Sequence, residues 1–201
     1  MKIGELPGVA PLLAVMLAYQ ISNFVYPAIW AYWTQTTFGW DASLVGASLA
    51  AYGVAIAVVQ GGLIRAVLPR LGEVRAVCWG LILNTACLVI YGLISEAWMI
   101  WVMIPISAVG AIVAPAMQGV MSRAAGADQQ GELQGVLASI SALSMVLSPL
   151  MMTQAFFWAT REGGPVWMPG APFLLSAMLM ATALAIFLGT GRARAQVTPA
   201  E

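Results

Sequence analysis

The sequence of 201 residues contains no histidine, and it has only eight basic and eight acidic residues. The missing histidine excludes histidine-based acid–base catalysis, histidine-ligated metals and the usual nucleophile triads. The low, balanced charge argues against a nucleic-acid partner, because such proteins carry a basic surface. We therefore expect no enzyme activity, no metal site, no cofactor and no nucleic-acid partner.

Cysteine is also scarce, with only Cys78 and Cys87 present. Both fall on one predicted helix, where a rise of 1.5 Å per residue separates them by roughly 13 Å. That distance is too long for a disulfide. We interpret both as buried apolar thiols.

Apolar side chains are in excess, since hydrophobic residues make up 61% of the chain and charged residues 8%. The mean hydropathy is +0.89. A soluble domain has roughly 25% charged and 45–50% apolar residues, so this composition indicates an integral membrane protein. The first residues show no convincing signal-peptide cleavage site, so we expect the first helix to be retained.

Six apolar segments are long enough to cross the hydrocarbon core, which takes about 20 helical residues. They are predicted at about 9–33, 43–64, 74–94, 98–121, 133–158 and 172–188. This pattern predicts an all-α integral membrane fold, a bundle of six transmembrane helices. The six-helix domain would occupy 9–190, between an N-terminal segment, 1–8, and a polar tail, 191–201.

The basic residues predict the orientation of these spans, because short arginine-rich segments stay cytoplasmic. With six spans, only Arg161 falls on the outer side. The residues on the inner side are Lys2, Arg65, Arg70, Arg75, Arg123, Arg192 and Arg194. We expect a multi-pass protein of the bacterial inner membrane with both termini in the cytoplasm.

The tryptophans favour the same orientation, because indole prefers the headgroup level of a bilayer. Six fall at the predicted outer ends of the spans, namely Trp33, Trp40, Trp98, Trp101, Trp158 and Trp167. We interpret them as an aromatic belt on one side of the membrane.

The segment 61–75, between the second and third spans, contains three of the eight basic residues. We predict it as a cytoplasmic loop with a gate or topology motif, made of Gly62, Arg65, Arg70, Gly72, Glu73 and Arg75. The arginines either anchor the topology or bridge helix ends through carboxylates or carbonyls, as a latch. Gly72 would supply a tight turn, and Glu73 would lie where a helix dipole favours a carboxylate.

The middle of every predicted span lacks charged residues, so the polar candidates there are amides. Four form the predicted substrate-cavity set, namely Gln20, Asn23, Asn84 and Gln118. The alternative, which we favour, is hydrogen bonding between helices at about 0.6 kcal/mol each.

Four stretches resemble the second half of the tetracycline/proton antiporters of the major facilitator superfamily. They lie at 40–43 leading into 48–53, at 70–76, at 115–123 and at 130–135. The resemblance implies one six-helix half of a twelve-helix secondary transporter, whose substrate sites lie between the halves. It also implies an acidic residue in the third span, where this chain has Asn84. Asn84 takes up no proton near neutral pH, so proton coupling there is not expected.

Two functions fit these observations. One is a transport half-module for drug or small-molecule efflux that acts with a partner half. The alternative is a non-transporting membrane subunit that packs in, or helps assemble, a larger membrane complex. In both cases lipid surrounds the bundle. A second membrane protein, or a second copy, is expected over the cavity face, because polar groups facing lipid cost free energy.

Overall fold

The structure is a computed structural model that describes residues 9–163 and 167–197. These residues are almost entirely helical, and no strand occurs among them. Six of the described helical segments are long and apolar enough to cross a membrane. They are Ala10–Phe38, Ala42–Leu71, Glu73–Leu93, Ala97–Ala124, Gln130–Thr160 and Ala171–Thr190. The predicted all-α class with six spans is therefore confirmed.

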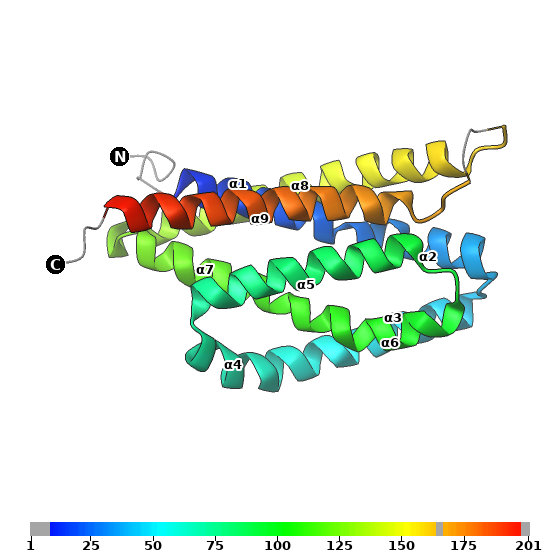
Figure 1. Cartoon of the computed structure of the whole chain (residues 1–201), viewed down its shortest axis with the longest axis horizontal. Helices are drawn as coiled ribbons and strands as arrows, with labels where there is room; N and C mark the ends of the chain where they lie inside the picture. Colours follow the sequence, from blue (N-terminus) through cyan, green and yellow to red (C-terminus); the bar gives the residue numbers. More distant parts are fainter. Residues whose placement is uncertain (1–8, 164–166, 198–201) are drawn as a thin grey trace.

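The first span consists of α1 (Ala10–Asn23) and α2 (Val25–Phe38), separated at Phe24. Figure 1 shows both among helices that lie side by side, with the start of α1 and the end of α9 at the same end of the bundle. Pro27 has no N–H, so the regular hydrogen bond four residues back is lost near the break.

Two serines tie this break to neighbouring helices. The Ser148 hydroxyl of α8 (Gln130–Thr160) donates to the Ile21 carbonyl at 2.8 Å. The Ser22 hydroxyl donates to the Ser176 carbonyl of α9 (Ala171–Val197) at 2.8 Å. Both serines are buried. The break is therefore a packed feature of the core.

The second span consists of α3 (Ala42–Val58), a π-helical turn η2 (Val59–Leu63) and α4 (Ile64–Leu71). Its start is capped by Asp41, whose carboxylate accepts from the Leu44 N–H at 2.8 Å. Its end is Gly72, with a φ of 78° that favours glycine.

The predicted loop over 61–75 is wrong, because the helix continues to Leu71 and only Gly72 separates α4 from α5 (Glu73–Leu93). The reason is the apolar side of α4, where Val67, Leu68 and Leu71 pack against the core while the arginines stay exposed. A cluster of basic residues marks the membrane surface, but it does not by itself break a helix.

The fourth span consists of α6 (Ala97–Val109), a 3₁₀ turn η3 (Gly110–Ile112) and α7 (Val113–Ala124). In η3 the Val113 N–H donates to the Gly110 carbonyl. Pro115 cannot donate to the carbonyl four residues back, which favours a local departure from α-helical geometry. The η3 turn is in contact with η2, so the two irregular turns pack against each other.

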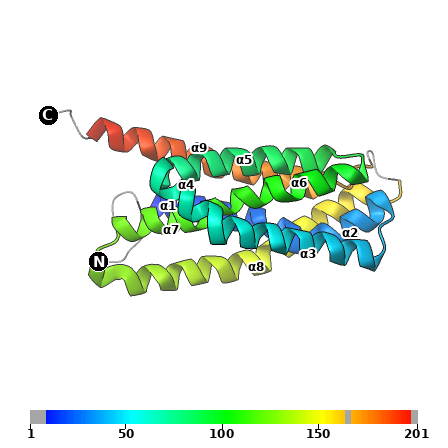
Figure 2. The same ribbon diagram turned by 90° about the horizontal axis from the view of Figure 1, so that it is seen from below.

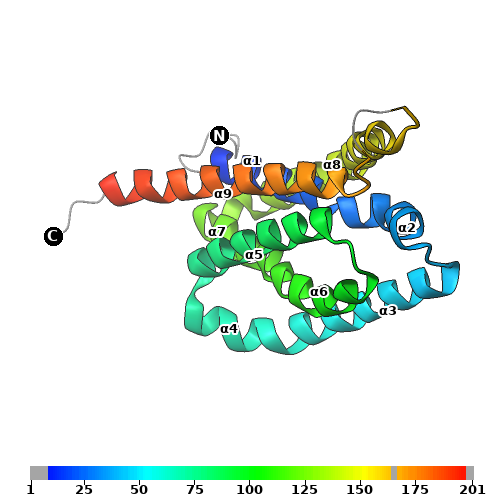
Figure 3. The same ribbon diagram turned by 45° about the vertical axis from the view of Figure 1, so that its right-hand side comes forward.

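A short 3₁₀ turn, η4 (Ala127–Gln129), leads into α8, and α9 completes the bundle. Helix α9 continues to Val197, so residues 191–197 of the predicted tail are helical. Helix α5 packs chiefly against α9 and α7, and α1 packs against α9 and α8 (Figures 2 and 3). Gly80 and Gly92 on α5 permit this close packing, because a side chain there would collide with Val113 and Leu174.

The predicted aromatic belt is wrong for Trp33 and Trp40, which are 1% and 7% exposed. Trp33 belongs to a buried cluster of rings with Trp30 and Phe173. Helix α2 directs the indoles of Trp30 and Trp33 toward the core. Trp30 Nε1 donates there to Ser48 Oγ at 2.9 Å. The other four predicted members, Trp98, Trp101, Trp158 and Trp167, are exposed.

Candidate functional site

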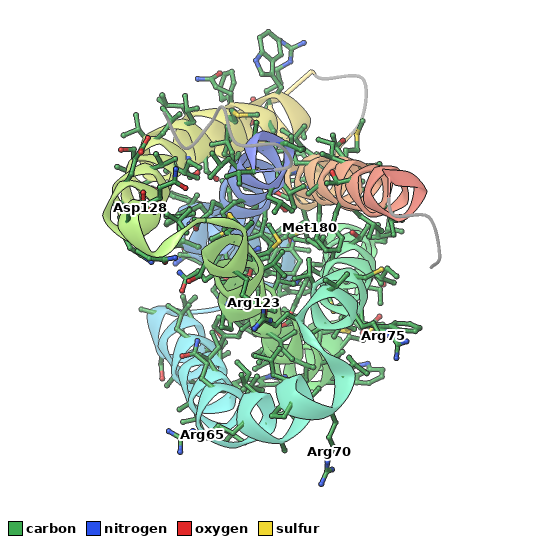
Figure 4. All side chains as sticks on the ribbon, turned by 90° about the vertical axis from the view of Figure 1, so that its left-hand side faces the viewer. Arg65, Arg70, Arg75, Arg123, Asp128 and Met180 are labelled. Carbon is green, nitrogen blue, oxygen red and sulfur yellow. The ribbon has the colours of Figure 1, made fainter. Side chains whose placement is uncertain are left out.

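One end of the bundle carries Arg65, Arg70, Arg75 and Arg123, and we call it the arginine end (Figure 4). Here Arg123, in the last turn of α7, forms an ion pair with Glu73, the first residue of α5. The Glu73 oxygen of this pair has no aligned hydrogen-bond donor among the described residues, so the contact is chiefly one of charge. Each charge also faces the helix end that favours it, a carboxylate at an N-terminus and a guanidinium at a C-terminus.

Gly119 makes room for this ion pair. An added Cβ at Gly119 would overlap the Glu73 carboxylate, since all three atoms of that group lie where the new carbon would sit. The Glu73 side chain is therefore held against the α7 backbone, with 16% of it exposed. The pair joins α5 to α7 at the arginine end.

Gln130 joins α7 to α8 at the same end. Its amide nitrogen donates to the Ser122 carbonyl at 2.9 Å and to the Ala125 carbonyl at 3.2 Å. Its amide oxygen accepts from the Ser122 hydroxyl at 2.9 Å. The last carbonyls of a helix lack partners within the helix, so this side chain caps the C-terminus of α7 from the next helix.

The structure places the residues of the predicted gate motif in different roles. Gly72 forms the turn and Glu73 the ion pair, whereas Gly62 lies inside the π-helical turn. Arg65, Arg70 and Arg75 are exposed and point away from the bundle, as Figure 4 shows. None of these three arginines forms an ion pair with another described residue.

Asn84 is the most enclosed of the four predicted cavity amides, at 3% exposure. Its nitrogen donates to the Gly80 carbonyl in its own helix and to the Gly110 carbonyl of η3, both at 3.0 Å. A Cβ at Gly110 would overlap this amide, so the two residues are in direct contact. Asn84 therefore makes an interhelical hydrogen bond, as expected if these amides hold helices together and do not line a substrate cavity.

The other three amides have less confined positions. Asn23 is half-buried and donates to the Tyr19 carbonyl of its own helix at 3.2 Å. Gln20 is half-buried and Gln118 is exposed. No hydrogen bond within the described residues joins any two of the four amides, so the structure does not assemble them into one polar site.

A cavity of about 20 Å³ lies elsewhere, where α2, α3, α5 and α6 meet. The residues that line it are uncharged, namely Tyr26, Trp30, Ser48, Leu49, Tyr52, Tyr91, Ile104 and Ser107. None of the predicted cavity amides is among them. Tyr26 contributes a buried hydroxyl that has no hydrogen-bond partner among the described residues.

Sequence reasoning missed Arg123, Gln130 and Tyr26 as residues of interest. The first two lie in stretches that carried the family resemblance. For Arg123 a separate signal was present, because opposite charges at the ends of two predicted helices can pair. Gln130 directly follows a short turn after α7, which is where a capping amide acts. The aromatic cavity had no such signal, because it depends on how four helices pack.

The chain is similar in sequence to tetracycline resistance proteins, although no family model matches it. It is 34% identical to the class E protein of Escherichia coli over 172 residues, which are 84% of this chain and 42% of the relative. It is 33% identical to the class D protein of Salmonella ordonez over 178 residues, 88% of this chain and 45% of the relative.

A human protein, hippocampus abundant transcript-like protein 1, is 29% identical over 192 residues, 88% of this chain and 38% of the relative. The chain thus spans about two fifths of the length of these relatives. The similarity to resistance proteins and the six apolar helices show a multi-pass membrane protein. The chain therefore resembles the tetracycline resistance proteins over most of its length, and its six apolar helices are consistent with one six-helix half of a major facilitator superfamily fold.

Proposed function

We propose that this bundle acts as one half of a drug-efflux transporter and moves its substrate only together with a second six-helix bundle. In this proposal the arginine end faces the cytoplasm of a bacterium, and the protein lies in the inner membrane. The observation that carries the proposal is the similarity to tetracycline resistance proteins over most of the chain, combined with an incompletely covered bundle.

The incomplete cover is concentrated on two spans. In the most apolar part of Ala42–Leu71 only 17% of residues are buried, and in that of Gln130–Thr160 only 22%. The other four spans have 39–44% of such residues buried. Figures 2 and 4 show α3 and α8, which belong to these two spans, along one side of the bundle.

The side chains on these two helices suit close contact with further helices. Gly46 and Gly53 on α3, and Gly135 on α8, have open space where a Cβ would be. Ala50 and Ala142 are exposed on the same two helices. Small residues let membrane helices approach closely, which supports a second helical bundle as the occupant of this side.

The contacts at the arginine end would keep the bundle rigid where it meets its partner. Glu73 with Arg123, and Gln130 with the end of α7, connect three helices at one level. Such connections favour movement of the bundle as a unit against its partner, which is how repeats of this kind give alternating access.

We infer that the spans of this bundle do not carry the proton in any proton-coupled transport. Asn84 is committed to two backbone carbonyls, and the sequence has no charged residue in the middle of a span. Proton relays use ionisable groups inside the membrane. We therefore expect that the chain alone drives no accumulation of tetracycline in vesicles with an imposed pH gradient.

The experiment is co-expression of this chain with a first six-helix half taken from a tetracycline resistance protein, with tetracycline efflux measured from cells. Efflux above that of either half alone supports the proposal. Crosslinking in membranes then reports the contact. A variant of the chain that lacks Cys78 and Cys87 carries a single cysteine in place of Ala50 or Ala142, and a single cysteine in place of Met178 on α9 is the exposed control.

Three outcomes are informative. Crosslinking at positions 50 and 142 with efflux supports a transport half. Crosslinking to another membrane protein without efflux supports the alternative, a non-transporting subunit of a larger complex. If positions 50 and 142 react with a lipid-soluble reagent as freely as position 178, and no efflux occurs, both forms of the proposal are wrong.

A further inference from the structure

Helix α5 has a continuous exposed stripe that begins at the arginine end. Six of its residues recur at spacings of three or four, namely Arg75, Trp79, Ile82, Ala86, Ile90 and Leu93. At about 100° per residue, these positions lie within roughly 80° of one another around the helix. The stripe is therefore a single face, with a guanidinium at its start, an indole one turn further on and aliphatic side chains beyond.

The stripe lies away from the side on which a second bundle is proposed. Figure 2 shows α5 and α9 along one side of the bundle, opposite to α3 and α8. A partner on α3 and α8 would leave the stripe uncovered, so its neighbour in a membrane is lipid. Lipid binding here requires only that the arginine end lies at a membrane surface, whether or not the bundle transports a substrate.

The two polar groups at the start of the stripe have no partner among the described residues. Arg75 is exposed, points away from the bundle in Figure 4 and forms no ion pair there. Trp79 is 63% exposed, and its indole N–H has no acceptor there. Side chains on a helix lean toward its N-terminus, which for α5 is the arginine end. The guanidinium thus reaches toward the headgroups, with the indole just beneath it.

We infer that the start of this stripe binds one phospholipid with an anionic headgroup. The phosphate would lie on the Arg75 guanidinium, an ester oxygen on the Trp79 N–H, and an acyl chain along Ile82 and Ala86. A guanidinium offers paired N–H donors that match two phosphate oxygens. Arg75 and Ala86 are about 16 Å apart along the helix, close to half of the ~30 Å hydrocarbon core, which is the depth of one leaflet. The apolar part of the stripe favours a lipid over free phosphate.

The charges at this end explain the preference for an anionic lipid. Glu73, two residues before Arg75, is already paired with Arg123. The positive charge of Arg75 therefore has no counter-charge among the described residues. A headgroup with a net negative charge, such as that of phosphatidylglycerol, supplies it, whereas the choline of phosphatidylcholine adds a further positive charge.

The two exposed arginines of α4 lack this arrangement. Helix α4 runs toward the arginine end, so the residue one turn deeper is four positions earlier in the chain. It is Gly61 for Arg65 and Ala66 for Arg70. Neither offers a ring or a side-chain donor to a lipid. Arg65 is therefore a matched control for Arg75, equally cationic and exposed but without an indole beneath it.

The test uses the full chain in nanodiscs of equal parts phosphatidylglycerol and phosphatidylcholine, with bromine on the acyl chains of one lipid at a time. Bromine quenches indole fluorescence on contact. The Trp79 signal is the difference between the unaltered chain and Trp79→Phe. We expect this signal to report about fivefold enrichment of phosphatidylglycerol, the ratio that one arginine near a membrane surface gives. Arg75→Gln should abolish the enrichment, and Arg65→Gln should keep it.

A second measurement tests the contribution of Trp79, whose own fluorescence is lost in Trp79→Phe. Native mass spectrometry of the solubilised chain counts the phosphatidylglycerol that stays bound. Arg75→Gln and Trp79→Phe should each retain less than the unaltered chain. The matched control for the indole is Trp98→Phe on α6, because Trp98 is also 63% exposed but has no arginine one turn away. It should retain as much as the unaltered chain.

Loss of the enrichment in Arg75→Gln, but not in Arg65→Gln, supports the site. Equal quenching of the unaltered chain by the two brominated lipids overturns it. Equal losses in Arg65→Gln and Arg75→Gln also overturn it, because they would indicate attraction to the whole basic surface. Retention that falls as much in Trp98→Phe as in Trp79→Phe rejects the contact with the indole.

Discussion

The side-chain nitrogen of Asn84 in α5 donates to the carbonyl oxygen of Gly110, at the residue where α6 gives way to the 3₁₀ turn η3. We predict that Asn84→Leu, which keeps the number and branching of the side-chain heavy atoms but removes both N–H donors, lowers stability by about 0.6–1.7 kcal/mol. The measurement is the midpoint of unfolding in detergent. Asn23→Leu is the control and should change less, because Asn23 bonds only within its own helix. Equal losses for the two variants would contradict a special role for the contact with η3.

The ion pair between Glu73 and Arg123 should show a measurable but small coupling. Arg123 is 70% exposed, so solvent screens the pair, and exposed pairs contribute about 0.2–1 kcal/mol. A double-mutant cycle with Glu73→Gln and Arg123→Gln, followed by the midpoint of unfolding, gives the coupling. The same cycle with Arg70→Gln in place of Arg123→Gln is the control, and its coupling should be near zero. A coupling of zero for both cycles would show that the pair is not formed in the membrane.

A side chain at Gly119 should displace the Glu73 carboxylate, which occupies the position of the missing Cβ. The carboxylate is the end of a flexible side chain and can move, so Gly119→Ala should cost about 0.2–1 kcal/mol, the contribution of the exposed ion pair that it breaks. Gly135→Ala is the matched control on α8, where the Cβ has open space. It should be neutral or stabilising, because alanine favours a helix more than glycine does. Identical effects of the two variants would rule out the steric explanation.

The topology prediction is independent of any contact between side chains. Reporter fusions after Arg75 and after Arg194 should both give a cytoplasmic signal, and a fusion after Arg161 should give a periplasmic one. The physical reason is the cost of moving arginine across the bilayer, together with seven basic residues on one side and one on the other. A periplasmic signal after Arg75 or Arg194 would reverse the orientation.

The six spans could be predicted from the sequence because each is a continuous apolar run, and some of their ends carry local signals. Asp41 precedes α3 at the N-cap position, where an acidic side chain commonly accepts a hydrogen bond from the first turn, and Gly72 ends α4 with a positive φ. Glu73 at the start of α5 was predicted from the helix dipole. These features depend on residues near one another in the chain, so the sequence is sufficient for them.

Which side of each helix faces the core could not be predicted in the same way. In a membrane span, residues toward lipid and residues toward the core are both apolar, so no amphipathic period marks the buried side. Trp33 was therefore placed at the membrane surface, although it lies in the core. The partners Gly110 for Asn84 and Arg123 for Glu73 depend on how helices pack, and a basic segment with an apolar side, α4, was taken for a loop.

The π-helical turn η2 has a consequence for the direction in which the arginines point. A π turn holds one more residue than an α turn, so everything after it is rotated by about 100° relative to an uninterrupted α-helix. This rotation sets which side of α4 faces the core, with Leu68 and Leu71 packed inward and Arg65 and Arg70 in the open. Removing one residue from η2, such as Gly61, would restore α-helical register and swing the guanidinium groups by a quarter turn or more, taking the apolar side of α4 off its core contacts.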